Sequence, residues 1–171
     1  MKRIFCCCLV VLFAVFQVNC ERDDVCGGST PTTPRIVVEF YDYNNTTLAK
    51  NVTNMTLKST ETDSVLTYTA TNKVFVPLKT FDTTTTYAFT INDDENPNTL
   101  TFTDSLMFNY ATRDVYVSRA CGYKTVFDLS QDIGIPAVIL NNGNPGTWIR
   151  NIVIDTHTIE FEDETHIRIY F

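Results

Sequence analysis

The two histidines, His157 and His166, are the first candidates for metal binding or acid–base chemistry, because the chain has no others. A zinc site needs three or four ligands. Neither HExxH nor CxxC occurs after the first nineteen residues. A turn at Glu162 and Asp163 would place the two rings out of register across a hairpin. We therefore expect exposed strand histidines and no metal site.

Carboxylates gather in two short segments, 93–95 and 160–164. Glycoside hydrolysis needs two carboxyl groups held across a cleft at a fixed separation, and a calcium loop alternates oxygen ligands around a glycine. Neither pattern is met, so both segments are predicted to be solvated turns, with a weak surface calcium site as the open alternative. No serine lies in GxSxG and no glycine loop could hold a phosphate. We expect no catalytic residue, no cofactor and no enzyme.

The three cysteines after the first nineteen residues are Cys20, Cys26 and Cys121, and a leader precedes them. Lys2 and Arg3 are followed by an apolar run from residue 4 to residue 16, which is the order of a secretory signal peptide. Thirteen helical residues rise about 20 Å, less than the roughly 30 Å of a bilayer core. We predict a cleaved signal peptide over residues 1–19, not a transmembrane helix.

The placement of Cys20, after this leader and before the charged segment 21–24, resembles the bacterial lipoprotein signal. In that signal the cysteine is acylated and becomes the new amino terminus. Asn19 departs from the small residue usual before it. Two or more acyl chains anchor a protein stably, whereas one anchors it marginally. We predict a palmitate-type lipid anchor on Cys20 and a cell-envelope location; the alternative is secretion with an ordinary thiol.

Lipidation of Cys20 would leave Cys26 and Cys121 as an even pair in an oxidising compartment. A disulfide between them would close a loop of 95 residues. By the chain-entropy model, closing a loop of this length stabilises the folded protein by roughly 4 to 5 kcal/mol. We predict this disulfide in preference to a nucleophilic Cys121.

The formal net charge of the chain is −7, and it falls to about −9 once Lys2 and Arg3 leave with the leader. An acidic surface of this kind repels phosphate backbones. We therefore expect no nucleic-acid partner.

Period-two alternation dominates the chain from Arg35 onward: Ile36, Val38 and Phe40 share one face of a strand, and Val37 takes the other. The further predicted strands are 52–58, 64–70, 74–78, 86–91, 99–108, 114–119, 123–129, 148–155 and 165–171. Residues 130–140 have no clear pattern and are read as a loop with one short turn or edge strand. No stretch has helical periodicity.

About nine short strands separated by Asn-, Asp- and Gly-rich turns predict an all-β fold. We expect a two-sheet antiparallel β-sandwich of immunoglobulin-like or transthyretin-like kind over residues 35–171. A closed barrel is the alternative. Residues 20–34, which include Pro31 and Pro34, are predicted to be a lipid-anchored tether.

Surface aromatics and modification sites are the remaining candidates. Tyr41, Tyr43, Tyr116 and Tyr170, together with Trp148, could form a binding surface, although packing explains most aromatics in a domain of this size. Candidate O-glycosylation sites are the hydroxyls of three Asp-Ser or Asp-Thr triplets, namely Ser64, Thr83 and Ser105.

Four segments stand out together, namely 20–26, 32–35, 108–110 and 117–123. They resemble an uncharacterised family of Bacteroidota outer-membrane lipoproteins. The resemblance covers nearly the whole chain after the leader and implies an outer-membrane lipoprotein with no established enzymatic role. Residues 21–24 are similar to surface-export signals, but Arg22 interrupts the acidic run, so periplasmic and surface-facing locations both stay open.

From these features we expect a non-catalytic protein-interaction or structural module, tethered to the membrane by lipid. An outer-membrane protein is the expected partner. A glycan- or ligand-binding surface protein is the alternative, and its ligand is unknown.

Overall fold

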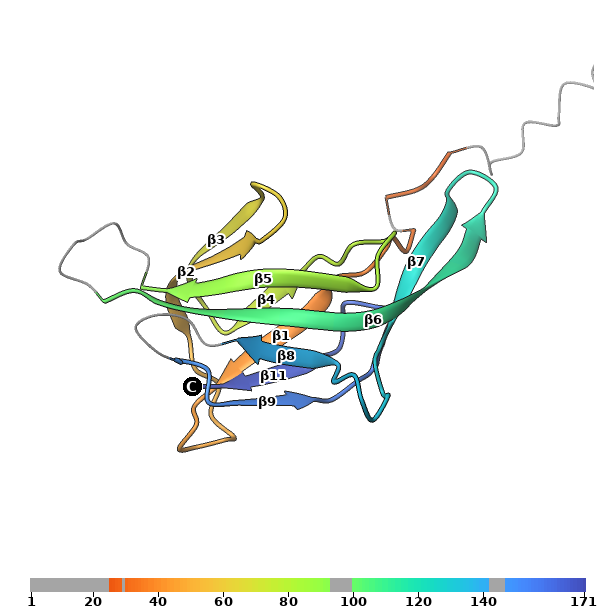
Figure 1. The fold of residues 1–171 in the computed structure, drawn as a ribbon. Coiled ribbons are helices and arrows are strands. Elements are labelled where there is room, and N and C mark those ends of the chain that lie inside the picture. The colour runs from red at the N-terminus through yellow and green to blue at the C-terminus, as the bar shows by residue number, and fades with distance from the viewer. Residues whose placement is uncertain (1–24, 29, 93–99, 142–146) are drawn as a thin grey trace, which may run out of the picture. The chain divides into compact units, whose positions relative to one another are not determined.

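The structure is a computed structural model that describes residues 25–28, 30–92, 100–141 and 147–171. Within these ranges the chain is all-β, with eleven strands and no helix (Figure 1). Among the described residues, therefore, no helix has the length and apolarity that a bilayer span requires. Cys20, the predicted leader and the acidic segment 93–95 lie outside the described residues.

The strands form two sheets (Figure 1). The first has the order β4-β1-β11-β9, made of β1 (Ile36–Tyr41), β4 (Lys73–Val76), β9 (Asn151–Ile154) and β11 (Ile167–Tyr170). The second has the order β10-β7-β6-β5-β2-β3, with β8 also paired to β6. Its strands are β2 (Val52–Ser59), β3 (Val65–Thr71), β5 (Thr84–Ile91), β6 (Phe102–Ser118), β7 (Gly122–Leu129), β8 (Val138–Asn141) and β10 (Thr158–Ile159).

This arrangement confirms the predicted two-sheet sandwich and excludes the closed barrel. The segments 99–108 and 114–119 were predicted as two strands, but residues 102–108 and 114–118 both belong to the single strand β6. Asn109 still pairs with Thr84 of β5, so the ladder continues where the sequence pattern breaks. The segment 130–140, which had no clear pattern, ends in the short strand β8 beside β6.

One strand pair departs from the antiparallel prediction: β1 and β11 run parallel, with Val38 opposite Ile167. These strands come from opposite ends of the domain and occupy the centre of the four-stranded sheet. Val37, predicted on the strand face opposite to Ile36, Val38 and Phe40, is fully buried like these residues.

The hydrophobic core contains residues from both sheets. Its largest fully buried aromatic residues are Phe40, Phe89, Phe108 and Phe127. Burying one such side chain contributes about 1.5–3 kcal/mol. The Trp148 ring packs against the core, and its indole N–H donates to the carbonyl oxygen of Phe89 at 3.0 Å.

The chain divides into two compact units. The smaller unit joins the segment ending at Thr30 to Tyr116–Tyr123, and the larger one comprises Pro31–Val115 and Lys124–Phe171. In the larger unit, the N–H of Thr125 donates to Thr33 Oγ1 at 3.0 Å. The last residues of the predicted tether are therefore attached to β7.

Candidate interaction surface

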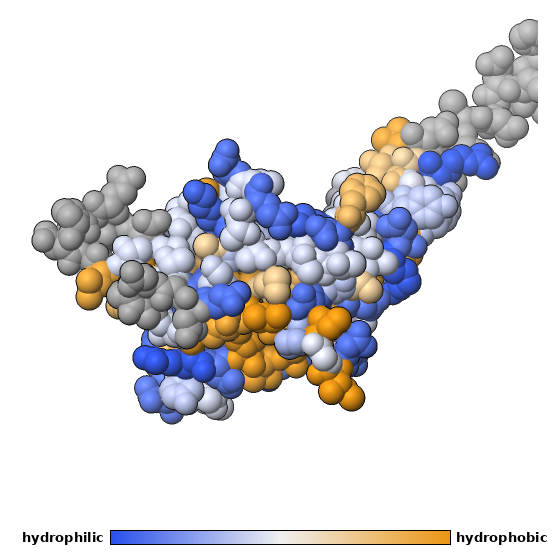
Figure 2. Space-filling view, in the orientation of Figure 1, coloured by the Kyte–Doolittle hydropathy of each residue, from blue (hydrophilic) through white to orange (hydrophobic). Residues whose placement is uncertain are grey.

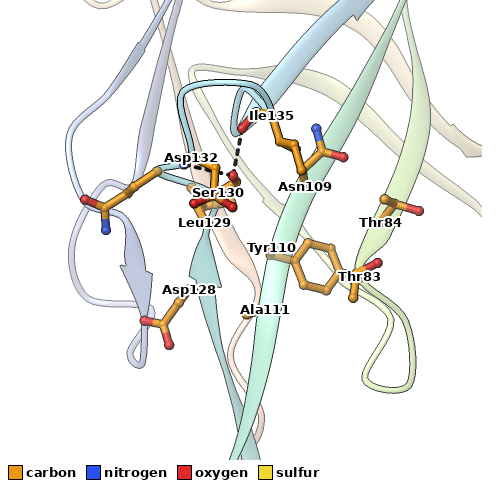
Figure 3. Close-up of a pocket in the computed structure, with 11 residues that line it drawn as sticks. Thr83, Thr84, Asn109, Tyr110, Ala111, Asp128, Leu129, Ser130, Asp132 and Ile135 are labelled. Carbon is orange, nitrogen blue, oxygen red and sulfur yellow. Dashed lines mark hydrogen bonds between the residues drawn. The ribbon is translucent and has the colours of Figure 1, made fainter.

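A pocket of about 470 Å³ lies beside the middle of β6 (Figure 3). Hydroxyl, amide and carboxylate side chains line it together with a few apolar ones. The lining residues are Thr83, Thr84, Asn109, Tyr110, Ala111, Asp128, Leu129, Ser130, Gln131, Asp132 and Ile135. They come from the start of β5, from β6, from the end of β7 and from the β7–β8 loop.

The β7–β8 loop forms one wall of the pocket, and Asn109 holds this loop in place. Its side-chain amide donates to the carbonyl oxygen of Pro136 at 2.7 Å, and its N–H donates to that of Ala137 at 2.8 Å. Its own carbonyl oxygen accepts the N–H of Ser130 at 2.9 Å. Ser130 Oγ in turn donates to the carbonyl oxygen of Ile135 at 2.7 Å (Figure 3). The three bonds of Asn109 hold both ends of the loop against β6, and the bond between Ser130 and Ile135 closes the loop itself.

Tyr110 contributes to the structure of the pocket and not to ligand chemistry. Its hydroxyl lies 2.6 Å from Thr85 Oγ1 and donates to the carbonyl oxygen of Lys79 at 2.9 Å. Its ring meets that of Phe127 edge-on, with the centroids 5.3 Å apart. Burial raises the pKa of the Tyr110 phenol, so the group stays protonated at neutral pH.

Acidic groups lie in and beside the pocket. Asp128 accepts the hydroxyl of Thr158 at 2.7 Å, and its other carboxylate oxygen is 3.9 Å from Arg113 Nε. Asp82 precedes the wall residue Thr83 and accepts from Lys79 Nζ at 2.7 Å. The Lys79 ammonium is the main cause that holds the pKa of Asp82 below its usual value. Asp82 is therefore ionised at neutral pH and adds negative charge beside the pocket.

Three exposed apolar side chains belong to the two chain segments, 79–83 and 130–136, that contribute lining residues to this pocket. Phe81, two residues before Thr83, and Ile133, in the β7–β8 loop, are both fully exposed, and Ile135 is half exposed. Hydrophobic surface also gathers over β8, where Val138, Ile139 and Leu140 are partly exposed (Figure 2). We call Phe81, Ile133 and Ile135 the apolar rim of the pocket.

Sequence reasoning did not identify the apolar rim or Asn109. The rim residues lie in the segments 79–83 and 130–136, which are otherwise rich in turn-forming and polar residues. Apolar residues gathered in such turns are the signal that could have found them, since exposed apolar patches, unlike single exposed residues, mark interaction sites.

The histidine prediction is wrong for His166, which is fully buried. Its Nδ1 accepts the N–H of Val37 at 2.9 Å, and its Nε2 is buried with no hydrogen-bond partner among the described residues. His157 is partly buried. The hairpin considered for the two rings does not form either, because β10 pairs with β7 and not with β11.

The burial of His166 predicts a pH-dependent stability. Burial lowers its pKa, against the opposing charges of Glu164, Asp163 and Glu162. The unfolded chain, with a histidine pKa near 6.5, therefore binds the proton more readily than the folded one. The free energy of unfolding should fall as the pH drops below about 6.5, by up to about 1.4 kcal/mol per pH unit until the folded pKa is reached.

Urea unfolding at pH 8, 7, 6 and 5 measures this dependence. The His166→Asn variant offers an amide oxygen to Val37 N–H but does not titrate, so its stability should change less between pH 7 and 5. Equal pH slopes for the two proteins would show that His166 is not the responsible group.

The acidic segment 160–164 is only partly a solvated turn. Glu162 forms a bidentate ion pair with the Arg35 guanidinium: its Oε1 accepts from Nε at 2.8 Å and its Oε2 from Nη2 at 2.7 Å. It also accepts the backbone N–H of Arg35. These bonds to Arg35 are the main cause that lowers the pKa of Glu162. Within the described residues, no three Asp, Glu, His or Cys side chains are grouped closely enough to hold a metal ion.

The selected tyrosines do not gather into one surface patch. Tyr41 and Tyr170 lie together, 5.8 Å between ring centroids, but Tyr170 is buried and the Tyr41 hydroxyl donates to Glu39. Tyr116 is exposed and stacks edge-on with Tyr123, which the sequence had not singled out. Tyr43 is exposed in the β1–β2 loop, whereas Trp148 belongs to the core.

The three candidate glycosylation sites differ in exposure. Ser64 is exposed between β2 and β3, and Thr83 is exposed at the pocket wall. Ser105 is partly buried within β6, opposite Ala88 of β5 and Asn141 of β8.

Cys26 and Cys121 form the predicted disulfide, with their Cα atoms 5.0 Å apart. The N–H of Cys121 donates to Ser118 Oγ at 3.1 Å in the turn between β6 and β7. A bonded Cys121 has no free thiolate, so the nucleophile alternative fails in this oxidised form.

Comparison with known proteins gives one match. Residues 53–171, which include the pocket and its apolar rim, match a family described as a family of unknown function (DUF6452). No curated protein and no solved structure matches the chain.

Proposed function

We propose that this chain, which belongs to the DUF6452 family of unknown function, is a lipid-anchored lipoprotein of the Bacteroidota outer membrane. Its β-sandwich acts as a non-catalytic module that binds another envelope protein. The observation that carries this proposal is the apolar rim, because Phe81 and Ile133 are large apolar residues held fully in solvent beside a pocket. A patch of exposed apolar side chains beside a pocket is typical of protein-binding sites.

The chemistry of the site indicates what the partner presents. The apolar rim offers contact area to a hydrophobic segment, and the pocket is large enough for one of its side chains. Asp128 and Asp132 add negative charge, and the chain as a whole is acidic. The favoured partner therefore exposes apolar residues flanked by Lys or Arg, since charge complementarity speeds and orients association.

Affinity purification of the tagged protein from its own membranes tests this function. The Ile133→Asp and Phe81→Asp variants should lose a stoichiometric partner that the unchanged protein retains. A buried apolar contact at an interface contributes about 1–3 kcal/mol, so the loss in affinity should be about tenfold or more. Both side chains are fully exposed, so neither change disturbs the core.

Leu48→Asp is the matched control, because Leu48 is also an exposed apolar residue but lies in the β1–β2 loop. It should keep the partner. Recovery of no partner, or equal loss in all three variants, would contradict an interaction site at the apolar rim.

The lipid anchor has its own test. Replacing Cys20 with serine removes the thiol to which the acyl groups would be attached. At about 0.8 kcal/mol per buried CH₂, loss of two or three chains should move the protein from the membrane to the soluble fraction. Membrane fractionation with detection of the tag measures this, and Cys26→Ser is the control. A membrane-bound Cys20→Ser protein would refute the anchor.

A glycan or other small ligand is the second candidate for the pocket. The hydroxyls of Thr83, Thr84 and Ser130, with the Gln131 amide and the two carboxylates, could bind a polyhydroxylated ligand. The buried Trp148 and Tyr170 cannot supply a sugar-stacking platform, so protein binding is favoured. Glycan-array binding that is lost in Ser130→Ala but unaffected by Ile133→Asp would reverse this order.

A further inference from the structure

The edge strand β3 contains neither the charged residues nor the prolines with which proteins often prevent edge-to-edge pairing. It ends the seven-stranded sheet, and among the described strands it pairs only with β2 (Figure 1). Its seven residues contain no charged residue and no proline. Edge strands are normally protected by lysine, proline, bulges or short length. A seven-residue uncharged edge is therefore an available docking site for another strand.

We propose that two copies of this chain associate through β3, whose edges pair antiparallel about a two-fold axis at Tyr68. In this register Leu66 faces Ala70 of the second copy, Thr67 faces Thr69, Val65 faces Thr71, and the two Tyr68 residues face each other. Each cross-strand pair is then apolar or hydroxyl-bearing, and pairs of these kinds stabilise antiparallel sheets. No like charges meet within the strand.

The alternation of β3 suits this self-pairing on both faces. Leu66 and Tyr68 lie on the face that packs against the core, so pairing would extend the apolar surface across the axis. Thr67 and Thr69 are exposed on the other face. The β-branched side chains there favour the extended strand conformation.

Charge and topology favour a second copy over a strand of another protein. The chain is strongly acidic, so its copies repel except where a surface carries no charge, as β3 does. With the same axis, the turn that contains the acidic Asp63 in one copy lies near Lys73, which follows β3, in the other copy. The opposite end of the sheet is the two-residue strand β10, which is too short to continue pairing, so the assembly closes as a dimer.

The molar mass of the purified full-length protein tests the proposal. Analytical ultracentrifugation from about 1 to 100 µM, with the mass of any bound detergent subtracted, should show a monomer–dimer equilibrium. The Thr67→Lys/Thr69→Lys variant places lysines opposite each other at the proposed axis. Its dissociation constant should rise on the order of tenfold or more.

The Thr101→Lys/Thr112→Lys variant is the control, because it adds the same charge at two exposed threonines outside β3. It should dimerise like the unchanged protein. Far-ultraviolet circular dichroism should show folded sheet in all three proteins. A monomer at 100 µM, or a dimer that both variants weaken equally or neither weakens, would overturn the proposal.

Cysteine pairs test the register. Directly opposite residues have Cβ atoms about 4.5–5.5 Å apart, but diagonal ones are about 7–8 Å apart. A mixture of Thr67→Cys and Thr69→Cys proteins should therefore form more disulfide-linked dimer than either variant alone. Equal cross-linking in the mixture and in the separate proteins would overturn pairing about Tyr68.

Discussion

Replacing Cys121 with serine is expected to lower the free energy of unfolding by about 4 kcal/mol under oxidising conditions. The disulfide to Cys26 spans 95 residues, and cross-linking a loop of this length removes much of the conformational entropy of the unfolded chain. For a domain of this size the loss corresponds to a decrease in melting temperature of roughly 10 °C. Thermal and urea unfolding, followed by the fluorescence of Trp148, measure it.

The Cys26→Ser variant should lose the same stability, and the double variant should lose no more, because both changes open one bond. The buried core residues all lie in the larger unit, outside Tyr116–Tyr123. The reduced protein should therefore keep its β-sheet circular dichroism at 25 °C. An unchanged melting temperature in Cys121→Ser would refute a stabilising role for the bridge.

Removing the Asp104 carboxylate is expected to destabilise the protein by about 3–5 kcal/mol. One carboxylate oxygen of this fully buried residue accepts the N–H groups of Trp148 and Ile149, both at 2.9 Å. Asp104→Ala leaves these two buried donors without this acceptor, and hydrogen bonds to a charged group contribute about 1.5–3 kcal/mol each. Urea unfolding should show the midpoint shifted to lower concentration.

Asp104→Asn separates the loss of charge from the loss of the acceptor. Its amide oxygen can still accept from both N–H groups, so it should lose less than half as much stability as the alanine variant. Asp63→Ala, in the exposed β2–β3 turn, should change stability by no more than about 0.5 kcal/mol. Equal unfolding midpoints for Asp104→Ala and Asp63→Ala would contradict a structural role for the buried carboxylate.

Asp104 also explains why the C-terminal part of the chain was only partly predictable. The apolar pattern predicts a strand over 148–155, but β9 begins at Asn151. The N–H groups of Trp148 and Ile149 bind a carboxylate from β6 instead of a neighbouring strand. That carboxylate comes from 44 residues earlier in the chain, so no local pattern could show it.

The sequence by itself determined the properties that depend on residues close together in the chain or on the number of residues of one type. Alternating residues specify which segments are strands, because successive side chains of a strand point to opposite faces. The predicted Cys26–Cys121 pair followed from excluding Cys20 and counting the remaining cysteines. The all-β class and the sandwich could be predicted for the same reasons.

The tertiary structure alone decided which distant strands meet and what they bury. The parallel pairing of β1 with β11 places His166 against Val37 and removes it from solvent. The bonds of Asn109 to the β7–β8 loop form the pocket wall and leave Ile133 exposed beside it. Such contacts depend on the summed packing of both sheets, whereas sequence periodicity reports only the local direction of a side chain.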